Sequence, residues 1–182
     1  MSSLTKHHPI IIILHWLIFL LLAANIYFGF SLADLDEGGT SSLPFDISAA
    51  HYSVGLLIGS MVVLRVLTRL GTKAPKPLPN WQPWEKKLAQ LILLVLYACM
   101  ILLPITGVLK ALSDQDAITF FGLFQLPAID ISNRVGHTAG EIHETLIPIL
   151  LSASALHIIG ALKHQFLDKD NTLYRIIFRK PK

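Results

Sequence analysis

The chain has 182 residues, 53% of them hydrophobic and 15% charged, a composition too apolar and too poor in charge for an ordinary soluble domain. The formal net charge is +3, but the basic residues lie beside apolar runs, where positive charge sets membrane orientation, so the composition indicates membrane lipid as a partner and no nucleic acid. A single cysteine, Cys99, excludes an internal disulfide and a thiolate metal site.

Four apolar stretches are long enough to cross a bilayer, because a spanning helix needs about 20 mostly apolar residues. The first stretch is longer than the apolar core of a signal peptide and ends without an A-x-A-like site, so we expect a retained helix. Backbone polar groups find no water in lipid, so each stretch should be helical. The sequence therefore predicts an all-α integral membrane protein, a four-transmembrane-helix bundle forming one domain over residues 1–182. The expected helices cover about residues 9–30, 47–70, 86–110 and 137–164.

Three loops separate these helices. The first contains the Gly- and Ser-rich residues 38–42. The second is stiffened by Pro75, Pro77, Pro79 and Pro83, and Trp81 and Trp84 are expected to anchor it at the membrane interface. The third, over about residues 113–136, is the longest, and its apolar middle at 118–126 is expected to form a short helix on the surface.

Charge predicts the orientation of the bundle. The first loop is acidic and has no lysine or arginine, whereas basic residues gather in the second loop and in the C-terminal tail. The positive-inside rule then predicts an N-in/C-in topology. In the third loop, which this topology places outside, Lys110 and Arg134 are outnumbered by Asp114, Asp116 and Asp130.

Four of the eight histidines lie inside the predicted spans and match in depth. His15 lies about 9 Å into the first span, and His157 lies at a similar depth from the same surface. His51 and His143 lie close to the opposite surface. His143 and His157 are 14 residues apart, which places them about 21 Å apart along one helix and only about 40° apart around it. Ionisable groups in spans usually mark function.

This pattern is typical of two haem groups held in the core of a helical bundle, because histidine is a common axial ligand of haem iron. A single histidine in a membrane helix could have a packing role through a hydrogen bond. This role explains four histidines in pairs of matched depth less well. The separation of about 21 Å excludes one zinc site made from all four rings. A proton relay stays open, although few acidic partners lie in the middle of the spans.

Short motifs occur in order along nearly the whole chain. They are Leu14-His15-Trp16-Leu17, His51-x-x-x-Gly55, residues 62–70, 103–107, 142–146, Ala155-Leu156-His157 and residues 169–175. In these motifs the chain resembles the bacterial cytochrome b561 family, most closely its superoxide oxidase-like members. The resemblance implies a multi-pass protein of the bacterial inner membrane with two haem b groups, whose iron ligands would be the pairs His15/His157 and His51/His143.

The resemblance also implies an enzyme, a superoxide:ubiquinone oxidoreductase with superoxide as the outer donor and ubiquinone as the acceptor. Lys110 and Arg134 would guide superoxide toward the outer haem. A role as simple interfacial charges explains these two residues equally well. Arg65, Arg69 and His164 are candidates for contacts with haem propionates or quinone. The two arginines share a helix face and also fit a role as snorkelling anchors.

The acidic outer loops do not fit superoxide as the donor, because their negative charge does not favour the approach of an anion. The alternative is an electron-carrying cytochrome b subunit that docks a protein dehydrogenase or hydrogenase, with a periplasmic redox protein as the donor. A structural or transport bundle without haem is a third and weaker alternative.

Overall fold

The computed structural model describes residues 6–36, 38, 45–72, 81–127, 129–170 and 172–177. Its long helices are α1 (Pro9–Asp36), α2 (Ile47–Gly71), α3 (Pro83–Ser113) and α4 (Asn133–Leu162). All four are long and apolar enough to cross a membrane. The four-helix membrane bundle predicted from the apolar stretches is thus confirmed.

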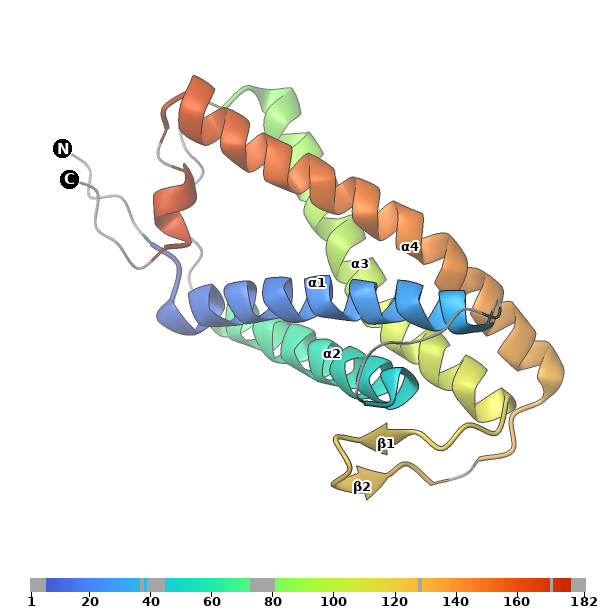
Figure 1. The fold of residues 1–182 in the computed structure, drawn as a ribbon. Helices are drawn as coiled ribbons and strands as arrows, with labels where there is room; N and C mark the ends of the chain where they lie inside the picture. The colour runs from blue at the N-terminus through green and yellow to red at the C-terminus, as the bar shows by residue number, and fades with distance from the viewer. Residues whose placement is uncertain are drawn as a thin grey trace.

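The bundle consists of two helix pairs. Helix α1 packs on α2, α3 packs on α4, and α2 joins the pairs by packing on α3 (Figure 1). At one end of the bundle the first described residues meet the last, because the His7 amide donates to the Arg175 carbonyl at 3.2 Å. Trp16 Nε1 donates to the Ile176 carbonyl at 2.8 Å beside them. We call this the terminal end, and the opposite end, which carries two short strands, the hairpin end.

The ends of the helices are set by caps and breakers rather than by the apolar runs. Helix α1 continues to Asp36, six residues beyond the end of its apolar run. The Asp46 carboxylate caps α2 by accepting from Ser48 N at 2.8 Å. Helix α3 begins at Pro83, and the Glu85 carboxylate accepts from the Gln82 backbone N–H at 2.8 Å. The apolar runs therefore mark the lipid-facing part of each helix and not its whole length.

Each helix pair has its own small core. Between α1 and α2 the buried side chains are Leu14, Ile18, Val54, Ile58 and Val62. Between α3 and α4 they are Leu96, Cys99, Leu150 and Ala153. Large apolar side chains remain exposed along the outside of all four helices. Such an apolar exterior is stable in lipid and not in water.

Small residues allow α3 and α4 to approach closely at the hairpin end. Gly136, Ala139 and Gly140 on α4 are buried. A Cβ atom at Gly136 would overlap the side chain of Ser113 at the end of α3. Close approach at small residues is the usual way in which membrane helices pack, because lipid supplies no hydrophobic drive between them.

Residues 118–126 form a β-hairpin, so the expectation of a short surface helix there was wrong. Strand β1 (Thr119–Phe120) pairs antiparallel with β2 (Phe124–Gln125). The turn has positive φ angles at Phe121 and Gly122, 49° and 70°. A glycine turn flanked by aromatic and β-branched residues favours a hairpin over a helix.

Parts of the loops lie outside the described residues. These parts are residues 39–44 of the first loop, residues 73–80 with three of the four loop prolines, and residues 178–182 of the basic tail.

We predict that Gly136→Ala lowers the stability of the folded bundle by about 1–3 kcal/mol, because the added methyl group overpacks the contact with Ser113. The measurement is the midpoint of denaturation of the purified protein in detergent. Gly71→Ala is the matched control, since a methyl group there meets no atom within 4 Å. Equal midpoints for the two variants would contradict this account of the α3–α4 contact.

Candidate functional site

Two of the four predicted histidines face each other at the hairpin end. His51 comes from the second turn of α2 and His143 from α4. Their ring centroids are 6.3 Å apart, with an angle of 73° between the ring planes. Both rings line a cavity of about 810 Å³ that reaches all four helices. The structure thus brings together two side chains that are 92 residues apart in the sequence.

Backbone carbonyl oxygens contact the Nδ1 atoms of these two rings. His51 Nδ1 lies 3.2 Å from the Asn25 carbonyl oxygen, and His143 Nδ1 lies 3.0 Å from the Leu103 carbonyl oxygen. A carbonyl only accepts, so each Nδ1 must carry the proton that it donates. In a neutral ring, Nε2 then keeps a free lone pair, which is the arrangement found in most metal-binding histidines. Thr106 Oγ1 adds a further contact with His143 Nδ1 at 3.1 Å.

Glycines give the two rings their space. A Cβ atom at Gly29 of α1 would lie 3.1 Å from His51 Cε1, and one at Gly107 of α3 would lie 3.2 Å from His143 Cε1. Each ring therefore approaches the backbone of a neighbouring helix closely, and a larger residue at either glycine would displace the ring.

The other two predicted histidines form an equivalent pair toward the terminal end. The ring centroids of His15 on α1 and His157 on α4 are 6.3 Å apart, with an angle of 74° between the planes. Trp16 packs edge-on against His15 at 5.3 Å. Arg65 of α2 donates from Nε to the Tyr97 hydroxyl at 3.1 Å and from Nη1 to the Ile11 carbonyl at 3.4 Å, which fixes its charge close to this pair.

The spacing of both pairs fits one iron ion between two imidazoles. A metal–imidazole bond of about 2.1 Å and a ring radius of about 1.1 Å on each side would place the centroids about 6.4 Å apart, close to the observed separation. The buried Asn25 Oδ1, which lines the cavity, has no hydrogen-bond partner among the described residues. An apolar cavity with a few convergent polar groups is the usual form of a cofactor site.

The remaining predicted residues are placed differently. Lys110 lines the cavity and pairs with Asp114 at 2.9 Å. Arg134 is exposed in the first turn of α4, away from the cavity lining. Arg69 is exposed in the last turn of α2. The pKa of the nearby His7 is lowered by burial and further by the charges of Arg69, Arg65 and Arg175, which shows how basic the terminal end is.

His164 lies at the terminal end, in a π-helical turn (Lys163–Leu167) that follows α4. Its ring is buried and stacks on Trp81 at 4.1 Å, with 7° between the planes. Its Nδ1 lies 2.7 Å from Asp168 Oδ2 and 3.3 Å from Asp170 Oδ2. Trp81 Nε1 also donates to Asp170 at 2.6 Å. Trp81 is therefore part of a packed cluster rather than a free interfacial anchor.

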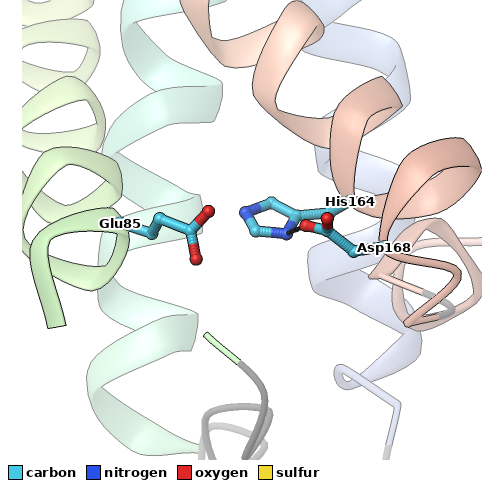
Figure 2. A group of neighbouring side chains, drawn as sticks. All are labelled: Glu85, His164 and Asp168. Atoms are coloured by element: carbon cyan, nitrogen blue, oxygen red, sulfur yellow. Dashed lines mark ion pairs between the residues drawn. The ribbon is translucent and has the colours of Figure 1, made fainter. Parts of the chain in front are cut away.

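Glu85, His164 and Asp168 lie close enough together to suggest a metal site, and Figure 2 shows the Glu85 carboxylate on one side of the ring and Asp168 on the other. However, Lys163 Nζ contacts Glu85 and also lies 2.8 Å from Asp168. Its ammonium group thus already supplies the positive charge between the two carboxylates. The group is an ion-pair network that joins the start of α3 to the end of α4.

Sequence reasoning missed the residues that hold the hairpin-end rings. Asn25 acts through its backbone carbonyl, Thr106 through its hydroxyl, and Gly29 through the lack of a side chain. None of these roles produces a recognisable spacing of residues in the sequence. A polar residue inside an apolar helix was the one available signal for Asn25.

Comparison with known proteins shows the family of the chain. A family model for prokaryotic cytochrome b561 matches residues 6–179. The chain belongs to the prokaryotic cytochrome b561 family. Cytochrome b561 homolog 2 of Escherichia coli K12 is 35% identical over 128 residues, covering 70% of this chain and 68% of that protein.

Two further relatives match over nearly their full length. Cytochrome b561 homolog 1 of E. coli K12 is 28% identical, covering 93% of this chain and 95% of that protein. A Yersinia pestis protein named probable superoxide oxidase CybB is 28% identical, covering 92% of this chain and 93% of that protein. As a member of the cytochrome b561 family, the chain is a multi-pass bacterial membrane protein that binds haem b through histidines and carries electrons as an oxidoreductase.

We predict that the stabilising contribution of Asp168 disappears in acid. The hydrogen bond from Lys163 holds the pKa of Asp168 below its ordinary value. A carboxylate with a lowered folded-state pKa contributes fully above the unfolded value of about 3.9, and its contribution is lost as pH falls through the folded value. The difference in melting temperature between the wild type and Asp168→Asn should therefore be constant above about pH 5 and shrink below about pH 4. Asp130→Asn is the control, and a difference independent of pH would contradict the pairing.

Proposed function

We propose that the chain holds two haem b groups, one between His15 and His157 and one between His51 and His143. The observation that supports this proposal best is the equal spacing of the two ring pairs, 6.3 Å in both. A single haem would require only one pair with this spacing. The lone pairs that the Nδ1–carbonyl bonds leave on the Nε2 atoms of His51 and His143 support it further.

Haem iron held between two imidazoles supplies one-electron transfer. The chain's own residues hold the rings, exclude water and set the charge around each pair. Two sites about 21 Å apart along α4 let an electron enter at one end of the bundle and leave at the other. With the N-in/C-in orientation, which we infer from the basic terminal end, the hairpin end is the outer, donor end and lies on the periplasmic side of the inner membrane.

We infer superoxide as the donor and ubiquinone as the acceptor. The likeness to a protein named probable superoxide oxidase supports the donor, and Lys110, which pairs with Asp114, contributes a cation to the cavity lining. In this reaction two superoxide anions each lose one electron and become two molecules of dioxygen. Ubiquinone takes up the two electrons and two protons and becomes ubiquinol. The chain supplies binding and electron transfer and needs no nucleophile.

For the acceptor, we propose the terminal end. Arg65 lies close to the His15/His157 pair and is held there by Tyr97, so it suits a haem propionate or a quinone oxygen. Arg69 extends the positive charge along the same helix face. His164 is buried against Trp81 in the turn that follows α4, so its ring offers a proton-carrying group at this end.

A second candidate donor is a redox protein with a basic surface. Among the described residues that line the hairpin-end cavity, the charged ones are Asp114, Asp116, Glu144 and Lys110. Three acids against one base repel an anion and attract a positively charged partner. A dehydrogenase or hydrogenase subunit with such a surface would use this chain as an electron carrier.

We predict that His51→Ala and His15→Ala each halve the haem content, because each variant removes one ligand of a separate site. The measurement is haem per protein from the pyridine haemochrome spectrum, together with the reduced-minus-oxidised spectrum. His137→Ala is the matched control, since that exposed histidine should leave the haem content unchanged. Loss of all haem from both single variants, with the bundle still folded, would contradict two separate sites.

We predict that a pulse of superoxide rapidly reduces the oxidised protein and that ubiquinone then reoxidises it. The measurement is stopped-flow absorbance of the b-type bands, with dithionite as the control for full reduction. If superoxide is the donor, Glu144→Gln should accelerate the reduction at low ionic strength and lose this effect at high salt. If dithionite reduces the b-type bands and superoxide does not, superoxide is not the donor, and a protein donor is then favoured.

A further inference from the structure

The β1–β2 hairpin carries an exposed apolar surface that no helix covers. Phe121, Leu123 and Phe124 are 51%, 78% and 58% exposed. The whole stretch 117–127 has no charged side chain. In Figure 1 the hairpin projects from the end of α3 across the start of α2. For a loop outside the membrane, an uncharged segment with three large exposed apolar side chains would be costly.

The hairpin is held beside the first turns of a helix that is long and apolar enough to span the membrane. Ser53 lies six residues after the start of α2 at Ile47, about 9 Å along the helix axis. Its hydroxyl donates to the Thr119 carbonyl at 2.9 Å and accepts from the Phe121 amide at 2.9 Å. The hairpin is thus pinned beside the interior of a spanning helix, close to the level of His51.

Part of the hairpin backbone is paired within the protein. Backbone groups that enter lipid must be satisfied within the protein, because no water is available there. Ser53, which is 1% exposed, satisfies two of these groups with one hydroxyl. Leu123 N–H donates to Phe120 O, and Leu126 N–H donates to Ile118 O, both at 2.9 Å.

The charged residue nearest the hairpin points away from the exposed surface. The Asp116 carboxylate accepts from the Tyr52 hydroxyl at 2.5 Å and lines the cavity. Ile118, which is 1% exposed, lines the cavity beside it. The hairpin therefore has two sides, with one side closing the cavity of the His51/His143 pair and the other bearing the phenyl rings.

We propose that the β1–β2 hairpin lies in the membrane, with Phe121, Leu123 and Phe124 in contact with lipid at the boundary between headgroups and acyl chains. Aromatic side chains prefer this boundary, and the contacts with Ser53, about 9 Å along a spanning helix, support this placement. A docked protein is the alternative that the test must separate from lipid, and the exposed surface offers it no charged side chain. The proposal rests on the membrane bundle alone and does not depend on the electron donor or acceptor.

The test uses the reactivity of a thiol, because a maleimide reacts with the thiolate and a thiol in lipid stays protonated. Leu123→Cys is made in a Cys99→Ala background, which removes the one native thiol. The full-length protein is placed in phosphatidylcholine nanodiscs that each hold one copy, and a membrane-impermeant maleimide is added. We expect Leu123→Cys to react at least about tenfold more slowly than Asp130→Cys, an exposed position beyond the hairpin. Labelling in dodecyl sulfate should make the two rates equal.

Equal rates in nanodiscs would overturn the proposal, because the hairpin tip would then be in water. Protection in native membranes that is lost in single-copy nanodiscs would also overturn it, because a protein partner would then be the cover. The haem spectrum of each variant reports whether the bundle is intact.

A second pair of variants tests how the hairpin is held. In the Leu123→Cys protein, Ser53→Ala removes the partner of Thr119 O and Phe121 N, and we expect the labelling rate to rise toward that of Asp130→Cys. Ser53→Thr keeps the hydroxyl and should keep the slow rate. Equal rates in the Ser53→Ala and Ser53→Thr backgrounds would overturn the pinning of the hairpin by Ser53.

Discussion

Each pair of facing imidazoles needs two helices held at a fixed separation, and the rest of the bundle is arranged around this requirement. The ring centroids are 6.3 Å apart at both levels. A shift of about 1 Å between helices would change what the rings can bind, because metal–imidazole bonds have a narrow range of length. The glycines against His51 and His143 and the carbonyls behind their Nδ1 atoms serve this fixed separation. Small residues between α3 and α4 and the ion pairs of Lys163 keep the helices themselves in register.

The sequence predicted those features that follow from hydrophobicity and helix period. Apolar runs gave the four helices, and the spacing of 14 residues between His143 and His157 gave two levels on one face of α4, where the structure indeed has two ring pairs. Helix α3 began at Pro83, before its apolar run, because the Glu85 carboxylate caps the helix there and lipid contact does not set where a helix starts.

Other features depend on contacts between distant segments and leave no local pattern. The hairpin was predicted as a helix because residues 118–126 are apolar, and apolar content alone does not separate a strand from a helix. Its structure depends on the Gly122 turn and on Ser53, which is nearly 70 residues earlier. In the same way, the stacking of Trp81 on His164 joins residues 83 positions apart, and Trp81 alone looked like an ordinary interfacial tryptophan.

The division of the ligands between the helix pairs has a consequence for biogenesis. His15 and His51 belong to the α1–α2 pair, whereas His143 and His157 both belong to α4. Neither half of the chain holds a complete ring pair, so under the proposed ligand assignment neither half alone can hold a haem between two imidazoles. Each helix pair has its own apolar core. Under the proposed assignment, haem loading at either level would require helices from both pairs, and a truncated chain would complete neither site.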